Sequence, residues 1–424
     1  MSNETKGSWR EAVAALLVII FLVRVGGWLL PAVIAAVLFM VVGHEFGHYI
    51  TAKWTGMKVT EYFVGFGPRL WSFRRGETEY GIKALPLGGY VKIVGMSSLE
   101  QIDDADEPRS YRAQTYPRRV LVASAGSLMH ALMALVVLVF TFAVLGMPDA
   151  SRVDVSSFTK WDGHAKNAAQ VAGFQRGDEI LSVSKGSTDK PVAISDASTF
   201  VSIVQHASGE QLRFTVRRDG ATRVLIATPV DGRTITSGGE HFAAPTGPAH
   251  GYLGVALENP NTRVSPLRAT TQSVSAVGSL IANTTASLPK MFSPKQLSSL
   301  FHEVTNSSAA QQSAQSGNRP VSGVGAVRLA VQSAQAGPRQ FLTLFATLNI
   351  FIGVLNLLPM MPLDGGLIVV ATYERIRTRK GQPRYQADLN QLAPFVYAFL
   401  TLLGFLFLAT MYLDIAHPIS NPFR

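Results

Sequence analysis

The chain has 424 residues, of which 47% are hydrophobic and only 16% are charged, so it is too apolar for an ordinary soluble protein of this length. Its formal net charge of +10 would suit a nucleic-acid-binding protein, but the Lys and Arg residues cluster beside long apolar segments, as in the inner loops of membrane proteins. We therefore expect a lipid bilayer, and no nucleic acid, as a partner. The chain has no cysteine, which excludes disulfides and thiolate metal ligands.

Four segments are long and apolar enough to cross a hydrocarbon core of about 30 Å, and we predict that they are transmembrane helices. They run from Val25 to Gly43, from Val120 to Leu145, from Phe341 to Leu358 and from Phe395 to Leu413. Residues 12–23 are also apolar and are expected to form an interfacial helix, an extension of the first span or a short extra crossing. Basic residues are concentrated between the first and second spans and between the third and fourth, so both connections should face the cytoplasm.

The first span ends in HEFGH, residues 44–48, which places two imidazoles and a carboxylate among hydrocarbon side chains. Polar groups in such a setting are costly unless something binds them. On a helix, His44 and His48 project from one face, and Glu45 lies beside the first of them. Two neutral imidazoles in this arrangement bind Zn²⁺, and the carboxylate takes a proton from water. We predict His44 and His48 as zinc ligands and Glu45 as the catalytic base; the alternative is a solvated polar face.

Residues 62–73 and 78–95 follow the first span and read as strands punctuated by Gly and Pro. A transmembrane helix hides its peptide bonds in its own hydrogen bonds, so a protease must unwind it before cutting. An edge strand can hold the unwound segment by β-addition. We expect Gly88 and Gly89 in the second strand to position a substrate; the alternative is a β-meander without substrate contact.

Residues 167–186 have the order of helix end, glycine turn and strand that is typical of bacterial PDZ domains. A helix near 197–206 and strands near 211–217 and 223–227 complete one such domain, and Gly251 to Leu257 follows as a short strand near the membrane. The domain could bind a peptide terminus or act as a size filter, and both readings stay open. Further on, residues 267–301 look amphipathic and helical, and the low-complexity residues 307–320 are expected to form a linker.

A third zinc ligand is needed, and the candidate lies in NLLPMMPLDGG, residues 356–366, at the end of the third span. Pro359 and Pro362 interrupt the helix, and irregular backbone at this depth is tolerated only where protein or water covers it. An acidic residue there is a functional candidate. We predict Asp364 as the third ligand; the alternative is a helix-terminating turn.

HEFGH together with NLLPMMPLDGG resembles the site-2 protease family of intramembrane zinc metallopeptidases, and most closely its bacterial branch that carries a PDZ domain and trims anti-sigma factors. The resemblance covers nearly the whole chain. It implies an α-helical polytopic membrane protein with four core transmembrane helices, a membrane re-entrant β-hairpin and one inserted α+β PDZ domain. It also implies hydrolysis of a peptide bond in or near the transmembrane helix of a single-pass, anti-sigma-factor-like protein. The expected location is the bacterial plasma membrane, with the active site toward the cytoplasm and the PDZ domain outside.

By this resemblance, His44, His48 and Asp364 match the family's zinc ligands, Glu45 matches its base, and Asn356 matches a residue that positions substrate or stabilises an oxyanion. The second span departs from the family pattern, because it reads GSLMH at residues 126–130 where G-P-x-x-N is common. His130 therefore stands where an amide is usual. We expect it to hydrogen-bond near the site, to touch the metal, or, most simply, to pack with a satisfied ring nitrogen.

Two rival functions remain at this point. One is a membrane metallopeptidase that cuts soluble loops with a later glutamate ligand, which the sequence LDGG fits poorly. The other is a zinc-stabilised scaffold that presents the PDZ domain without proteolysis, in which Glu45 would serve no purpose. The expected organisation is an N-terminal segment (1–24), first span (25–57), cytoplasmic or re-entrant β region (58–118), second span (119–147), PDZ domain (150–260), amphipathic helices and linker (261–338), third span (339–366), cytoplasmic loop (367–393), and fourth span with C-terminal tail (394–424).

Overall fold

The structure is a computed structural model, and it describes residues 17, 20–21, 23–96, 102–186, 189–237, 240–243, 248–316, 319–378, 385–387 and 393–423. The predicted N-terminal segment 1–24 falls almost entirely outside these residues, as do parts of the predicted cytoplasmic loop 367–393. The chain forms two compact units, one made of Met1–Thr141 with Pro266–Arg424 and the other of Phe142–Ser265. Each is described here by itself.

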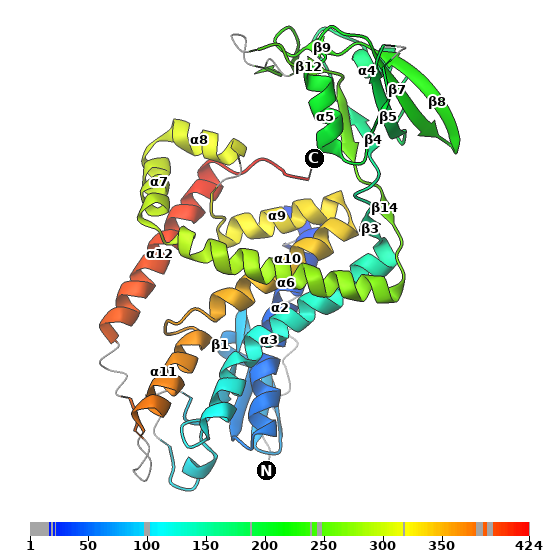
Figure 1. The fold of residues 1–424 in the computed structure, drawn as a ribbon. Helices are drawn as coiled ribbons and strands as arrows, with labels where there is room; N and C mark the ends of the chain where they lie inside the picture. The colour runs from blue at the N-terminus through cyan, green and yellow to red at the C-terminus, as the bar shows by residue number, and fades with distance from the viewer. Residues whose placement is uncertain are drawn as a thin grey trace. The chain divides into compact units, whose positions relative to one another are not determined.

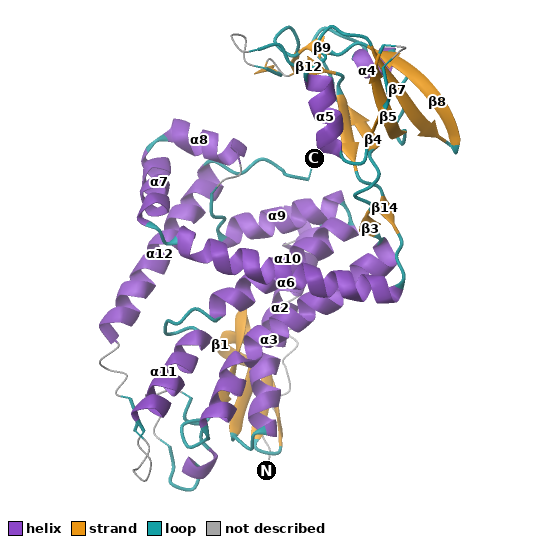
Figure 2. Ribbon diagram, in the orientation of Figure 1, coloured by secondary structure: helices purple, strands orange, loops and turns teal. Residues whose placement is uncertain are grey.

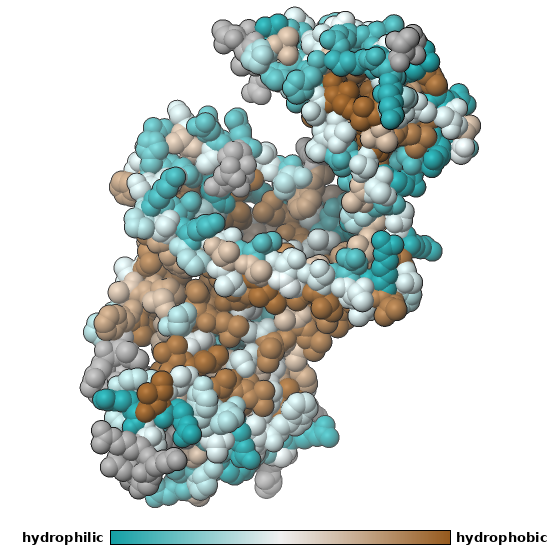
Figure 3. Space-filling model, in the orientation of Figure 1, coloured by the Kyte–Doolittle hydropathy of each residue, from teal (hydrophilic) through white to brown (hydrophobic). Residues whose placement is uncertain are grey.

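Within the described residues, the first unit contains four helices long and apolar enough to cross a membrane, as the sequence predicts. They are α2 (Leu29–Trp54), α3 (Tyr116–Phe140, extended by the π-helix η2, Thr141–Leu145), α10 (Pro338–Asn356) and α12 (Ala393–Ala416). Large apolar side chains on these helices stay exposed, for example Phe39, Val136 and Phe407, each with more than half of its surface accessible. Figure 3 shows hydrophobic side chains gathered over the middle of this unit. Lipid, rather than water, is the solvent that suits them.

Helix α3 lies at the centre of the first unit, in contact with α2, α10 and α11 (Asp364–Arg377) (Figure 1). Small residues allow the backbones to approach where helices gain little from hydrophobic burial against lipid. A methyl group on Gly47 of α2 would lie 2.5 Å from the carbonyl oxygen of Ala125 on α3. A methyl group on Gly353 of α10 would lie 3.0 Å from Cβ of His130 on α3. The first close approach brings the HEFGH segment against α3, and the second brings α10 against α3.

Strands β1 (Val59–Arg75) and β2 (Thr78–Ile93) form a sheet that contacts α2 (Figure 2). Residues 61–64 pair in opposite order with residues 92–89 and in the same order with residues 79–82. Residues 71–75 pair in opposite order with residues 82–78. The two long strands therefore supply four short segments, and residues 89–92 lie at one edge of the sheet.

Hydrogen bonds attach the sheet to α2 at several places. The hydroxyl of Tyr62 donates to the carbonyl of Val42 at 2.9 Å. At the β1–β2 turn, Glu77 accepts from Lys53 at the end of α2 (2.7 Å) and from both terminal nitrogens of Arg109 (2.8 Å each). The hydrogen bonds with Arg109, followed by those with Lys53, lower the pKa of Glu77 to about 2. Arg109 belongs to the short helix η1 (Glu107–Arg109).

The remaining helices of the first unit are α6 (Pro266–Met291), α7 (Pro294–Thr305), α8 (Ser307–Ser316) and α9 (Gly323–Ala336). The prediction of a linker after residue 306 was wrong for residues 307–316, because they form α8. Alanine has the highest helix propensity, and Ala310 is fully buried in a cluster with Leu300 of α7 and Leu413 of α12. Packing of small side chains therefore orders a segment whose composition alone indicates a linker.

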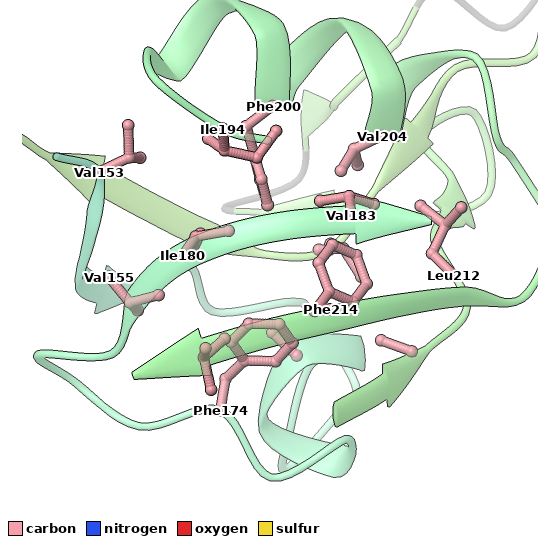
Figure 4. Packing of buried hydrophobic residues seen from close by; sticks show 14 of the residues in the cluster. Val153, Val155, Phe174, Ile180, Val183, Ile194, Phe200, Val204, Leu212 and Phe214 are labelled. Carbon is pink, nitrogen blue, oxygen red and sulfur yellow. The ribbon is translucent and has the colours of Figure 1, made fainter. Parts of the chain in front are cut away.

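The second unit is built on a six-stranded sheet in the order β13-β4-β5-β7-β8, with β6 paired to β5. Its elements are β3 (Met147–Pro148), β4 (Asp154–Phe158), α4 (Ala168–Val171), β5 (Glu179–Lys185), β6 (Val192–Ala193), α5 (Ala197–Gln205), β7 (Leu212–Arg218), β8 (Ala221–Ala227), β9 (Val230–Asp231), β10 (Thr236–Ser237), β11 (Glu240–His241), β12 (Gly251–Tyr252), β13 (Val255–Glu258) and β14 (Asn261–Thr262). Figure 4 shows Phe200 of α5 over Val183 and Phe214 of the sheet.

The segment from Gly251 to Leu257, predicted as a short strand near the membrane within the domain 150–260, belongs to this unit and contributes to two strands. It supplies β12 and most of β13, and β13 pairs with β4 at the end of the sheet. β13 is too short to be assigned to a sheet from its own sequence, so its position in the sheet follows only from its pairing with β4.

Candidate active site

Helices α2 and α11 bring the three predicted ligands together. Nε2 of His44 lies 3.2 Å from Nε2 of His48, and Oδ2 of Asp364 lies 3.5 Å from the first nitrogen and 3.3 Å from the second. Ligand atoms bonded tetrahedrally to zinc at 2.0–2.1 Å are about 3.3 Å apart. The three atoms are therefore spaced as ligands of one ion are, and they form a group able to hold a metal.

The hydrogen bonds that these three side chains make, and those that they lack, favour a cation between them. Nδ1 of His48 donates to the carbonyl of Val122 on α3 at 2.7 Å, which leaves the lone pair on Nε2 free to bind a metal. Oδ2 of Asp364 and Nδ1 of His44 are buried without a hydrogen-bond partner among the described residues. An unpartnered buried carboxylate oxygen is costly, and a divalent cation between the three ligands would satisfy it. The donor set of two imidazoles and one carboxylate fits zinc.

Glycine residues bring the two neighbouring segments close enough to complete the site. A methyl group on Gly126 of α3 would lie 2.3 Å from Cε1 of His44 and 2.6 Å from Nε2 of His48, so only glycine fits there. A methyl group on Gly365 would lie 2.2 Å from the carbonyl oxygen of Leu358. Gly365 thus allows α11 to begin close to the end of α10, with Asp364 as its first residue.

Glu45 is next to His44 in the sequence but lies outside the group of three predicted ligands, and its side chain contacts the sheet. Its Oε2 accepts a hydrogen bond from the main-chain N–H of Val91 at 3.1 Å. A methyl group on Gly89 would lie 3.5 Å from Cγ of Glu45, so β2 passes directly against this side chain. Gly88, with φ +153°, has the backbone conformation that favours glycine, and a methyl group there would lie 2.9 Å from the ring of Phe66.

The sequence model of peptidase family M50 matches residues 32–402 of the chain. The chain belongs to this family. It is 32% identical over 410 residues to the zinc metalloprotease Rip1 of Mycolicibacterium smegmatis, with 91% of the chain and 96% of that protein covered. It is also 32% identical over 416 residues to the zinc metalloprotease Rip1 of Mycobacterium tuberculosis, with the same coverage. The protein is therefore a zinc metalloprotease, and its resemblance to the site-2 protease family is confirmed.

In this M50 peptidase, His130 lies next to the three predicted ligands but is not part of their group. Its ring centroid is 5.0 Å from that of His44, and its Nδ1 lies 3.0 Å from Oδ1 of Asn349 on α10. Asn349 donates its Nδ2 to the carbonyl of Phe345 at 2.9 Å, so its Oδ1 is the acceptor and His130 is the donor. This arrangement matches a packed ring with a satisfied nitrogen. Asn349 carries no motif, and sequence reasoning missed it.

Asn356, which the sequence predicts to position substrate, is the last residue of α10 and is partly exposed. In the described part of the chain it makes no side-chain hydrogen bond to His44, Glu45, His48 or Asp364. Its match to a substrate-positioning residue stays a prediction.

A buried ion pair that sequence reasoning also missed holds the ligand helix α11 to α3. Nη1 of Arg119 lies 2.5 Å from Oε2 of Glu374, and the two side chains are 4% and 10% exposed. The guanidinium of Arg119 also lies 5.0 Å from the ring centre of Tyr111. Asp364 and Glu374 sit on one helix, so this pair fixes α11 against the helix that carries Gly126. The only signal in the sequence is the pair Arg118 and Arg119 at the start of an apolar span.

Proposed function

We propose that this zinc metalloprotease hydrolyses a peptide bond in or near the transmembrane helix of a single-pass membrane protein, such as an anti-sigma factor already shortened outside the membrane. The observation that carries the proposal is the helix on which two of the ligands lie. His44 is preceded in α2 by about 22 Å of apolar helix, at 1.5 Å per residue, and His48 lies one turn further along the same membrane-spanning helix. Ligands on a loop would suit soluble substrates, whereas ligands on a spanning helix suit a substrate that is itself in the bilayer.

The residues around the site have distinct tasks in this reaction. Zinc, when bound by His44, His48 and Asp364, supplies a Lewis acid that makes water nucleophilic near neutral pH. Glu45 accepts a proton from the attacking water and then donates it to the amine of the departing peptide. Val122 keeps His48 in the tautomer that binds metal, through the hydrogen bond to Nδ1.

The contact between β2 and Glu45 supports the substrate clamp predicted from the sequence. Residues 89–92 occupy an edge of the sheet, and that edge passes against the candidate base. A substrate segment added to this edge as a further strand would be extended, with its peptide bonds exposed beside Glu45. The extended form is what hydrolysis requires, since a helix buries its peptide groups in its own hydrogen bonds.

We infer that the protein sits in a bacterial plasma membrane with the β1–β2 sheet on the cytoplasmic side, because Lys and Arg are concentrated there. We also propose that the second unit is an extracytoplasmic PDZ domain. A cavity of about 290 Å³ lies between α5 and the strands β12 and β13, lined by apolar residues that include Val201, Val204 and Leu253. A groove between a helix and an edge strand suits an extended peptide terminus. This favours peptide binding over the size-filter reading.

The alternative of a zinc-stabilised scaffold without proteolysis loses its support, because the chain belongs to a peptidase family. The deciding experiment reconstitutes the full chain in liposomes with a single-pass substrate and locates the cut by mass spectrometry. We expect cleavage within or beside the substrate's transmembrane helix. Glu45→Gln should abolish it while zinc stays bound, and Glu303→Gln on α7 is the matched control. Cleavage confined to soluble loops of the substrate would refute the proposal.

A further inference from the structure

The main chain of β2 supplies a contact to Glu45 that the family motifs do not include. Residues 61–64 pair with residues 92–89 without a break in register, so this part of the sheet is a regular antiparallel ladder. In such a ladder the N–H and C=O of one residue point to the same side, and residues two apart point the same way. Because the N–H of Val91 points at Glu45 on α2, the main-chain groups of Gly89 share that direction. Both residues therefore face away from β1.

We propose that the main-chain N–H of Val91 is the positioning group for the catalytic base of this protease. It holds Oε2 of Glu45 at 3.1 Å and leaves Oε1 free to take the proton from water. A hydrogen bond to a carboxylate is stronger than one between neutral groups, so a single donor can hold a side chain that otherwise rotates about three bonds. The inference rests on the proposed role of Glu45 as base.

Two further contacts keep this donor in place. The bond from the hydroxyl of Tyr62 to the carbonyl of Val42 ties the neighbouring strand to α2, three residues before Glu45 in the chain. Tyr62 is also the ladder partner of Val91. Gly89 carries no side chain that could push Glu45 away, since even a methyl group there would only just touch Cγ at 3.5 Å. These contacts thus fix β2, α2 and the carboxylate of Glu45 relative to one another.

The hydrogen bond from Val91 to Glu45 also limits how a substrate can pair with the sheet edge formed by residues 89–92. The N–H of Val91 is taken by Glu45, so a substrate strand can use the outward main-chain groups of Gly89 but not that N–H. Gly89 lies about 7 Å from Val91 along the strand. A methyl group on Gly89 would lie 3.5 Å from Cγ of Glu45, so a peptide bond held at Gly89 lies close to the base. The hydrogen bond from Val91 to Glu45 therefore sets the register of the substrate strand.

Val91→Pro in the full chain tests the proposal, with Val91→Ala as the matched control. Proline removes the N–H, and it is tolerated at edge positions where the N–H takes no part in the ladder. We expect Val91→Pro to lower kcat by about 10-fold or more, with KM and zinc content unchanged, since general-base catalysis contributes about 10²–10⁴-fold. Val91→Ala keeps the N–H and removes only the side chain, so its kcat should exceed that of Val91→Pro by about 10-fold or more. A wild-type kcat in Val91→Pro, or an equal loss in Val91→Ala, would overturn the proposal.

A second measurement keeps the proposal testable if Val91→Pro fails to fold. Hydrogen–deuterium exchange of the full chain without substrate should be about 10-fold or more faster at the Val91 amide in Glu45→Ala than in the unaltered protein, with Lys92 unchanged. Equal exchange at Val91 in both proteins would show that Glu45 does not hold this N–H. Because no substrate is present, the exchange rate at the Val91 amide does not depend on whether the substrate is a transmembrane helix. A failure of intramembrane cleavage alone would leave the exchange difference intact.

Discussion

Oδ2 of Asp364 lies 3.3 Å from Nε2 of His48, although the two residues come from opposite ends of the chain. The contact depends on α11 beginning at Asp364 and on α3 packing against both helices. It joins a local helical motif to a distant carboxylate in one metal-binding group. The zinc chemistry of the protein therefore depends on tertiary packing as much as on the HEFGH motif.

Asp364→Asn is expected to weaken zinc binding on the order of 100-fold or more and to abolish cleavage. The amide keeps the size of the carboxylate but loses its charge, and even partners behind metal ligands cost about 10–100-fold in affinity when changed. Elemental analysis after dialysis against a chelator measures the loss. Asp189→Asn, at an exposed position of the second unit, is the control and should keep its zinc. Full zinc retention in Asp364→Asn would contradict the assigned ligand set.

Gly126→Ala should displace both imidazoles, because the added methyl would lie 2.3 Å from His44 and 2.6 Å from His48. A misplacement near 1 Å can cost about 100-fold in rate, so we expect a fall of that order in kcat/KM together with weaker zinc binding. Gly278→Ala on α6 adds the same methyl where no atom lies within 4 Å, and it should change neither quantity. Normal activity in Gly126→Ala would mean that α3 stands further from the ligands than the structure shows.

Arg119→Leu should leave the carboxylate of Glu374 buried without its charge partner. Breaking a buried ion pair in this way costs about 3–5 kcal/mol, whereas replacing both partners by apolar residues is often close to neutral. We therefore expect a large fall in thermal stability and in zinc affinity for the single variant. The double variant Arg119→Leu/Glu374→Leu should recover most of both. Equal behaviour of the single and double variants would rule out the ion pair as the tie between α3 and α11.

The attachment of the β1–β2 turn should weaken in acid. The pKa of Glu77 is lowered to about 2 in the folded protein, below its ordinary value of 4.5, chiefly by hydrogen bonds with Arg109 and Lys53. A depressed carboxyl pKa contributes stability that is complete above the unfolded value and is lost as pH falls toward the folded value. The difference in melting temperature between the unaltered protein and Glu77→Gln should be constant above about pH 5 and shrink between about pH 4.5 and 2. A difference independent of pH would exclude the charged form of Glu77 as its source.

Val201→Asp should abolish peptide binding by the second unit. Val201 lines the groove beside α5 and is 41% exposed, so a carboxylate there would repel a peptide C-terminus without disturbing the core. Selection of random C-terminal peptides on the full chain in detergent provides the probe. Val224→Asp on β8, which is 53% exposed and does not line the cavity, is the control. If no peptide is enriched by the unaltered protein, the size-filter reading replaces peptide binding.

Local sequence determined the parts of this protein that depend on neighbours in the chain. Long apolar runs are enough to specify spanning helices, and the four-residue spacing of His44 and His48 places both imidazoles on one face of any helix. The sequence also predicted Asp364 as the third ligand, and the structure brings its carboxylate to the two imidazoles, at the point where α10 has ended and α11 begins.

Only the tertiary structure decided the contacts between segments that are far apart in sequence. The residues around Gly126 do not indicate that two imidazoles lie against it. Val91 contacts Glu45 through its main-chain N–H, a group that every residue except proline possesses. The helical structure of residues 307–316 and the position of β13 in its sheet likewise depend on contacts with segments far away in the sequence. Side-chain type and periodicity are properties of the local chain, whereas the partner of a buried atom is set by which backbones can approach one another.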